Sequence, residues 1–244
     1  MRGVLLICRR ELAAYFLSPL AYVFIVIFLA LSGGLTFYVG GFLQRGQADL
    51  NAFFQFHPWL YLVLIPAVGM RLWAEERKTG TIEFLMTLPI ATGQAVVGKF
   101  LAAWLFSGIA LLLTVPLWFT VNHLGSPDNG VILTAYLGSW LMAGGFLALS
   151  VCLSAVTSNQ VIAFVLAASA CFLFLMSGLD LVQGFLRDWA PPFFVDAIAG
   201  FSFLTNYQAL SQGVIDLRNV IFFVSLMAVS LAINTAIIEL KKGG

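Results

Sequence analysis

Residues 131–179 read VILTAYLGSWLMAGGFLALSVCLSAVTSNQVIAFVLAASACFLFLMSGL, a run without a single charged side chain. A helix needs about 20 apolar residues to cross the hydrocarbon core of a bilayer, so this run is long enough for two crossings. The polar residues 157–160, TSNQ, predict an elbow between two helices. The stretch therefore predicts a membrane protein rather than a soluble domain.

The rest of the chain has the same character. Its 244 residues are 61% hydrophobic and 9% charged, whereas about a quarter of a soluble domain is charged. Four further uncharged runs are long enough to span a membrane, at residues 20–42, 50–70, 100–121 and 220–238. We expect one all-α membrane domain over residues 1–244 with six transmembrane helices.

Charge placement predicts the orientation. If both termini are cytoplasmic, nine Lys and Arg residues lie inside and three lie outside, at Arg45, Arg187 and Arg218, which agrees with the positive-inside rule. The first run is too long for a signal peptide and no small-residue cleavage site follows it, so we expect it to be retained. Cys8, Cys152 and Cys171 show no paired spacing, and we expect packing residues rather than disulfides or metal ligands.

Two segments outside the spans are themselves partly apolar. Residues 2–17 place Val4, Cys8, Leu12 and Phe16 on one helical face, which predicts an amphipathic helix in the inner interface, the alternative being a simple extension of the first span. Residues 180–219 are aromatic and too long for a turn, and we expect one or two short helices that dip into the outer leaflet.

Small residues recur at four-residue spacing in the two spans of the opening run, at 135, 139 and 143 and again at 163, 167 and 171. Such stripes let helix backbones approach closely. Pattern alone leaves open whether the stripes meet within one chain or between two chains.

Residues 73–89, WAEERKTGTIEFLMTLP, concentrate charge between two apolar runs. The cluster at 75–78 would cost roughly 10 kcal/mol at the bilayer centre, so it lies outside the hydrocarbon. We expect the second span to continue through Trp73 at the interface, and Gly80 to interrupt the helix. Thr81 then caps a short helix that ends near Leu88, with Glu83 in its first turn and Ile82, Leu85 and Met86 on one side. An ordinary solvated loop is the alternative.

This segment, AEERKTGTIEFLMTLPI, resembles the signature between the second and third spans of ABC-2 type transporter permeases. The stretches RRELAAYFLSPLAYVFI, FHPWLYLVLIPAVGMRLWAEE, TSNQVIAF and LSQGVIDLRNVIFF are similar to the permease of the gliding-motility-associated ABC transporter group. The resemblance runs over nearly the whole chain.

The resemblance implies a dimer of six-span subunits, homomeric or heteromeric, with a separate ATPase subunit beneath it that holds ATP and Mg²⁺. It implies an N-terminal interfacial helix at 2–17, a coupling helix at 81–88 and membrane-dipping helices at 180–219. An auxiliary membrane protein with an extracytoplasmic domain is a further implied partner, and the location is a bacterial inner membrane in contact with lipid. The residues expected to couple to the ATPase are Glu75, Glu76, Arg77, Lys78, Gly80, Thr81, Ile82, Glu83, Leu85 and Met86.

Three other functions fit the sequence poorly. Residues 93–99, GQAVVGK, match the first part of a phosphate-binding loop, but Phe100 replaces the required Ser or Thr and an apolar run follows. The paired acids Glu75 and Glu76 lack the further motifs of an intramembrane metalloprotease. The spans carry no charges, which disfavours an ion-coupled transporter. We expect no catalytic residues, no cofactor or metal in this chain, and no nucleic-acid partner.

The leading interpretation is the permease subunit of an ATP-driven exporter for a lipidic, polymeric or other amphipathic cargo. The alternative is an ATP-driven membrane anchor that transmits force to an extracytoplasmic partner without translocating a substrate, with residues 180–219 as its docking surface. No substrate-binding residue is identified, because Ser and Thr in spans more often bond their own helix backbone than a ligand.

Overall fold

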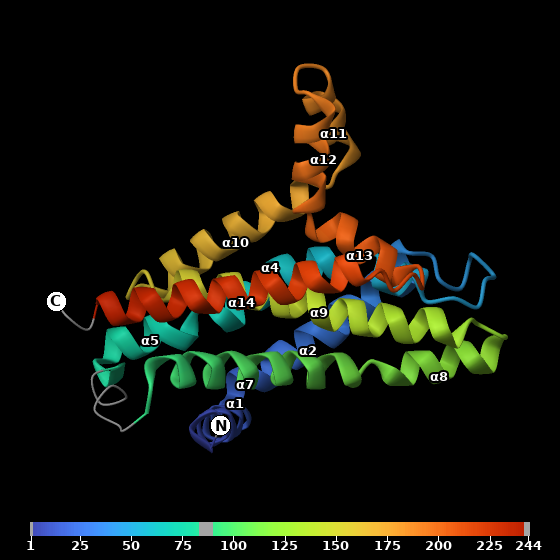
Figure 1. The fold of residues 1–244 in the computed structure, drawn as a ribbon. Coiled ribbons are helices and arrows are strands. Elements are labelled where there is room, and N and C mark those ends of the chain that lie inside the picture. Colours follow the sequence, from blue (N-terminus) through green and yellow to red (C-terminus); the bar gives the residue numbers. More distant parts are fainter. Residues whose placement is uncertain (1, 83–89, 242–244) are drawn as a thin grey trace.

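Helices make up most of the computed structural model, which describes residues 2–82 and 90–241. No strand occurs among those residues, so the predicted all-α class is confirmed there. The long helices run side by side in an elongated bundle (Figure 1).

The N-terminal part forms two helices at a steep angle to each other. α1 (Arg2–Leu17) ends at Ser18, whose hydroxyl caps α2 (Pro19–Gly34) by accepting from the Leu20 amide. Pro19 suits this position because the first turn of a helix needs no amide donor from it. α2 continues into a π-helical turn, Leu35–Val39.

The predicted second span is divided into three pieces: α3 (Asn51–Phe54), α4 (His57–Gly69) and α5 (Arg71–Thr79). The first of these pieces, α3, is a single short helix of four residues. The third run forms α7 (Thr92–Leu112) and α8 (Val115–Leu124), with a break at Leu113 and Thr114. Pro116 lies just after that break, and proline is well tolerated in the first turn of a new helix.

The opening run of the sequence forms α9 (Asn129–Ser154) and α10 (Gln160–Met176), joined at the predicted elbow. The Asn159 side chain accepts from the amides of Val161 and Ile162 and so caps α10. The last long helix is α14 (Leu217–Leu240).

α9 is the centre of the bundle and packs on α4, α7, α10, α13 and α14. Both small-residue stripes are buried within the chain. Ser139 contacts α4, where its hydroxyl bonds His57 and Tyr61, whereas the Cys171 thiol of α10 donates to the Phe146 carbonyl of α9. The stripes therefore serve contacts inside one chain.

Residues 180–219 contain three short helices rather than the predicted one or two: α11 (Asp180–Arg187), α12 (Pro192–Gly200) and α13 (Phe203–Ser211). Pro191 and Pro192 separate the first two, and the Ser202 hydroxyl caps the third by accepting from Leu204 and Thr205. Figure 1 shows α11 and α12 as an arm that stands out sideways from the bundle, while α13 lies against it.

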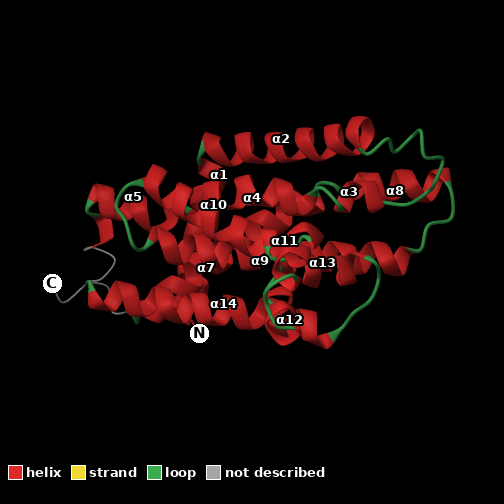
Figure 2. Ribbon diagram, turned by 90° about the horizontal axis from the view of Figure 1, so that it is seen from above, coloured by secondary structure: helices red, strands yellow, loops and turns green. Residues whose placement is uncertain are grey.

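α1 lies across the other helices, as Figures 1 and 2 show from two directions. Its main contact is α7, which it approaches closely because residue 98 is glycine. A Cβ at Gly98 would lie 2.8 Å from the Ile7 Cβ. A crosswise helix at one level of the bundle is the arrangement expected for residues in a membrane interface.

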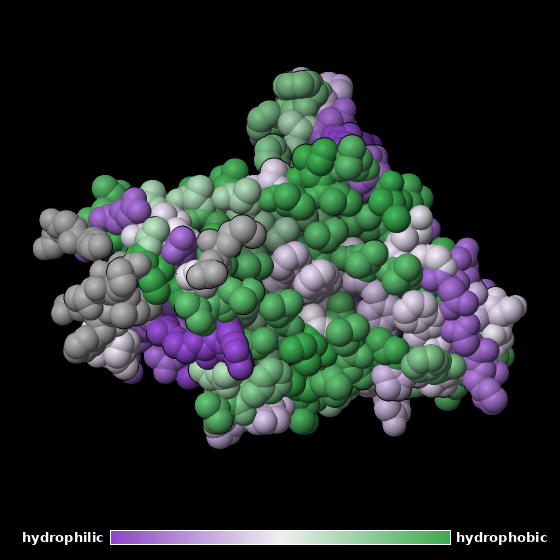
Figure 3. All heavy atoms as spheres, turned by 60° about the horizontal axis from the view of Figure 1, so that its bottom comes forward, coloured by the Kyte–Doolittle hydropathy of each residue, from purple (hydrophilic) through white to green (hydrophobic). Residues whose placement is uncertain are grey.

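Four helices are long and apolar enough to cross a membrane within the described ranges, or five if α10 and α11 form one bent span. The described part of the chain therefore belongs to a multi-pass membrane protein. The predicted count of six is not confirmed, because the break at Met70 leaves α4 short and α5 charged. Figure 3 shows apolar residues over the middle of the bundle and hydrophilic residues toward its two ends and on the arm.

Candidate functional site

The break between α4 and α5 is held by one side chain of α9. Ser154 donates its hydroxyl to the Met70 carbonyl at 2.7 Å and accepts from the amides of Trp73 and Ala74 at 3.3 and 3.1 Å. A buried helix end needs partners for its backbone groups, and a hydroxyl has one donor and two acceptor positions. Ser154 therefore fixes the direction in which α5 leaves the bundle.

α5 ends at the residue that the sequence predicts. Gly80 has a φ of +73°, in the left-handed region that favours glycine, and its amide donates to the Arg77 carbonyl at 3.3 Å. The end of the bundle that carries Gly80 also carries the C-terminal end of α14 (Figure 1), and we call it the α5 end.

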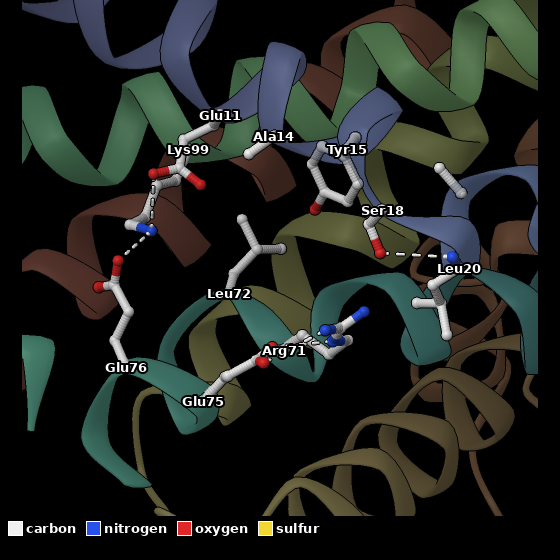
Figure 4. Close-up of a pocket in the computed structure, with 11 residues that line it drawn as sticks. Glu11, Ala14, Tyr15, Ser18, Leu20, Arg71, Leu72, Glu75, Glu76 and Lys99 are labelled. Carbon is white, nitrogen blue, oxygen red and sulfur yellow. Dashed lines mark hydrogen bonds and ion pairs between the residues drawn. The ribbon is translucent and has the colours of Figure 1, made fainter. Parts of the chain in front are cut away.

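Three helices that are far apart in the sequence meet at Lys99. This α7 side chain is 2% exposed, and its ammonium lies 2.7 Å from a carboxylate oxygen of Glu76 on α5 and 3.2 Å from one of Glu11 on α1. Figure 4 shows Glu11 and Glu76 approaching the ammonium from opposite sides. We call these three residues the Lys99 junction. A buried ammonium requires such partners, because an unpaired charge in a low dielectric is strongly unfavourable.

Glu11 is held in its ionised form. Burial alone would raise the pKa of its carboxyl, but the charge of Lys99 and the hydrogen bond from Arg10 outweigh burial, and the pKa lies below its ordinary value. Glu11 therefore pairs with Lys99 as a carboxylate at neutral pH.

Arg71 and Glu75 form a separate ion pair on α5, four residues apart and 2.8 Å between Nε and Oε2. Both side chains are about one-third exposed or more, so the pair contributes only about 0.3–0.5 kcal/mol. Its effect is local, since both partners belong to the same helix.

An open crevice of about 180 Å³ separates α1 and the start of α2 from α5 (Figure 4). Its walls carry the Lys99 junction, the Arg71–Glu75 pair and the Tyr15 side chain. Within residues 2–82 and 90–241, no group of three His, Cys, Asp or Glu side chains is placed to hold a metal ion. The crevice is thus a mixed-charge gap between two helices, bridged at one point by Lys99.

The other predicted site residues continue along the same segment. Arg77 is half-buried, and burial lowers the pKa of its guanidinium, while Lys78 is exposed. The Thr81 hydroxyl lies within hydrogen-bond distance of the Glu76 carbonyl and the Thr79 hydroxyl, and Ile82 packs against the core. Glu83, Leu85 and Met86 lie outside the described residues, as does most of the predicted 81–88 helix.

Trp73 does not lie on an unbroken continuation of the second span, as the sequence predicts, because the helix breaks at Met70. Its side chain is fully buried, with the Lys99 ammonium 5.3 Å from the ring centroid, a cation–π distance. After this break α5 packs against α9 and α10.

Sequence reasoning missed a second polar cluster inside the bundle. His57 and Tyr61 of α4 both bond the Ser139 hydroxyl of α9, at 2.7 and 2.8 Å, and the His57 side chain is fully buried among Phe28, Phe53 and Phe54. The signal for it was the histidine in an otherwise apolar run. The cluster joins α4 to α9 away from the α5 end.

The residues 93–99 that match a partial phosphate-binding loop are helical, in the first turns of α7. A phosphate-binding loop needs several backbone amides turned toward the phosphate, whereas the amides of a continuous helix bond its own carbonyls. Lys99 is also already committed to two carboxylates. Nucleotide binding by this motif is therefore excluded.

Comparison with known proteins agrees with this arrangement. The model of the family described as ABC-2 family transporter protein matches residues 20–238. No curated protein matches the chain significantly. Members of this family are membrane components of ABC transporters and work with a separate ATPase subunit. Since the match covers far more than half of its length, this chain belongs to the ABC-2 transporter family.

Proposed function

We propose that this chain is the permease subunit of an ATP-driven exporter and that residues 75–88 are its contact with the ATPase subunit. The observation that carries the proposal is the attachment of α5, which emerges from the membrane helices and is held by Ser154 at its start and by Lys99 at Glu76. A segment with these attachments transmits displacement, whereas a free loop absorbs it.

Within this segment the residues have different proposed roles. The charged group Glu75, Arg77, Lys78 and Glu83 supplies ion pairs with the ATPase, and the apolar group Ile82, Leu85 and Met86 fills a groove on it. Gly80 and Thr81 set the angle between α5 and the coupling helix. The inward-facing ion pair of Glu76 assigns this residue to transmission within the permease rather than to the ATPase surface.

The α5 end is cytoplasmic in this proposal, and both termini lie on that side. Six spans follow if α3, α4 and α5 together make one crossing and α10 makes another. α4 contributes 13 residues to its crossing, which is about 20 Å of helix at 1.5 Å per residue. The neighbouring helix α3 and the first residues of α5, before the charged group at 75–78, supply the remaining length.

The proposed assembly is a dimer of permease subunits, homomeric or heteromeric, in a bacterial inner membrane. The proposed auxiliary subunit with an extracytoplasmic domain rests on the likeness to the gliding-motility-associated group, and the proposed cargo is lipidic, polymeric or otherwise amphipathic. The exposed apolar residues of the α11–α12 arm, which include Leu181, Phe185 and Phe193, favour the alternative of a force-transmitting anchor with a docking surface.

The proposal is tested by purifying the chain with its ATPase in mild detergent and measuring binding and stimulated ATP hydrolysis. Glu83→Lys combined with Leu85→Asp is expected to weaken ATPase binding about tenfold or more, the change produced by losing roughly 1.4 kcal/mol. Glu239→Lys is the matched control, because it reverses an exposed acid on α14 at the same end of the bundle. Wild-type binding and stimulation by the double variant would contradict the proposed contact.

Transport and anchoring are separated by a second measurement on the same complex. Reconstituted vesicles that lose or gain an amphipathic cargo on addition of ATP support the exporter. A complex that hydrolyses ATP only when an extracytoplasmic partner is bound, with no cargo movement, supports the anchor.

A further inference from the structure

The Lys99 junction bridges two helices that otherwise form opposite walls of a crevice. α1 contributes Glu11 and α5 contributes Glu76, and the two carboxylates meet at one ammonium supplied by α7. Figure 4 shows the crevice opening beside this contact, lined by Tyr15 on one wall and Leu72 on the other. The junction is therefore a point at which movement of one wall reaches the other.

The burial of Lys99 limits what the junction can do. Its side chain is 2% exposed, whereas those of Glu11 and Glu76 are 17% and 19% exposed. The carboxylates can be solvated from the crevice if they part, but the ammonium cannot reach water without a change of packing. Lys99 therefore pairs with both carboxylates. If either carboxylate moves away, only the other remains to compensate the buried ammonium charge.

The two other ion pairs beside the junction do not connect α1 with α5. The Arg71–Glu75 pair lies within α5, and the Arg10–Glu11 pair lies within α1. The close packing of α1 on α7 at Gly98 holds α1 to the bundle but makes no contact with α5 itself. Charge compensation at Lys99 thus ties α1 to α5 in a way that packing on α7 does not.

We propose that Lys99 is a positioning residue that makes α1 move together with α5, so that the N-terminal helix belongs to the moving part of the molecule. The inference rests on the proposed function, in which the ATPase displaces residues 75–88. Residues 75–88 are linked along the chain to α4 on one side and to α7 on the other, so a displacement of this segment reaches both helices directly. The Lys99 junction adds a second route, because it passes the displacement of α5 to α1, which is not its neighbour in the sequence. An interfacial helix that shifts with α5 also shifts the start of α2.

The test measures movement rather than stability. Spin labels are placed on cysteines introduced at Ala13 of α1 or at Thr79 at the end of α5, each paired with a label at Leu124 of α8. All three positions are exposed, and Cys8 is replaced by serine to remove the accessible native thiol. Distances are measured in the complex with its ATPase, diluted with unlabelled chain, without nucleotide and after trapping with ATP and vanadate.

In wild type, trapping is expected to change both the distance from Leu124 to Thr79, called the α5 distance, and the distance from Leu124 to Ala13, called the α1 distance. Glu76→Gln and Glu11→Gln each remove one carboxylate charge while keeping the side-chain shape, and Lys99 retains its other partner. In either variant the α5 distance is expected to change as in wild type, while the change at α1 falls to less than half. Glu239→Gln, an exposed acid at the same end, is expected to leave both changes intact.

The outcomes separate the two proposals. If α1 follows α5 to the wild-type extent in both variants, Lys99 serves only stability and the inference is overturned. If neither label moves in the wild-type complex, the proposed function itself is contradicted and this inference falls with it. A change at α1 that is lost in Glu76→Gln and in Glu11→Gln, with α5 still moving, supports the coupling.

Discussion

Glu11 is the residue at which pH acts most directly on the α5 end. Its pKa in the folded protein lies below the ordinary value of 4.5, so its contribution to stability is complete above that pH. The contribution is lost as the pH falls below 4.5 through the lower folded-state pKa, because protonation removes one of the two charges that compensate Lys99.

The corresponding prediction concerns Glu11→Gln. At pH 7 we expect it to lower the free energy of unfolding by about 1.5–3 kcal/mol, the range for losing a hydrogen bond to a charged group. Between pH 5 and 3 the melting temperatures of variant and wild type, measured in detergent, are expected to converge. A difference that stays constant or grows toward low pH would contradict the assigned direction.

Ser154 gives a second prediction at the level of one side chain. Ser154→Ala leaves the Met70 carbonyl and the amides of Trp73 and Ala74 without the hydroxyl that satisfies them. We expect a loss of about 1–3 kcal/mol in thermal or denaturant unfolding. Ser150→Ala is the matched control, because this buried serine of the same helix donates to the Phe146 carbonyl of its own helix. Equal losses in the two variants would show that the break at Met70 does not depend on Ser154.

Individual helices differ in how far their limits can be predicted. The elbow at 157–160 was predictable because polar residues interrupt an apolar run, and the end of α5 because Gly80 follows a charged helix. The break at Met70 carries no such local mark. It is stabilised by Ser154, which lies more than 80 residues away in the sequence, so no pattern within residues 50–79 could reveal it.

The Lys99 junction shows the same limit. Lys99 and Glu11 are 88 residues apart, whereas the spacing rules for helices relate residues three or four apart. A lone lysine at the head of an apolar run was the only signal, and it indicates a need for a partner without naming one. The charge cluster at 75–78 was found from composition, but the inward pairing of Glu76 required the fold.

A prediction for a whole helix concerns the packing of α1 on α7. Gly98→Ala adds a Cβ 2.8 Å from the Ile7 Cβ, so α1 must shift. We expect faster hydrogen exchange of α1 amides and a free energy of unfolding lower by about 1–3 kcal/mol. Gly93→Ala on the same helix is the control, since its added Cβ would lie 3.8 Å from the nearest atom, on Thr235. Unchanged α1 protection in Gly98→Ala would contradict the described contact.

The molecule as a whole has two distinct ends, and its orientation in the membrane is testable. Thr79 lies at the α5 end and Gln44 in the loop at the opposite end (Figure 1), and both are exposed. In intact cells we expect a membrane-impermeant maleimide to label Gln44→Cys but not Thr79→Cys, with Cys8 replaced by serine. Labelling of Thr79→Cys from outside would invert the proposed topology and remove residues 75–88 from the reach of ATP.

The α11–α12 arm projects sideways from a bundle whose long helices define the direction across the membrane (Figure 1). Its footprint in the plane of the bilayer is therefore wider than that of the helices alone. A neighbouring molecule on this side either packs against the arm or remains farther from the bundle than the tip of the arm. The distance at which a neighbour can approach on that side is thus set by the eight residues of α11 and the nine residues of α12 rather than by the shape of the bundle.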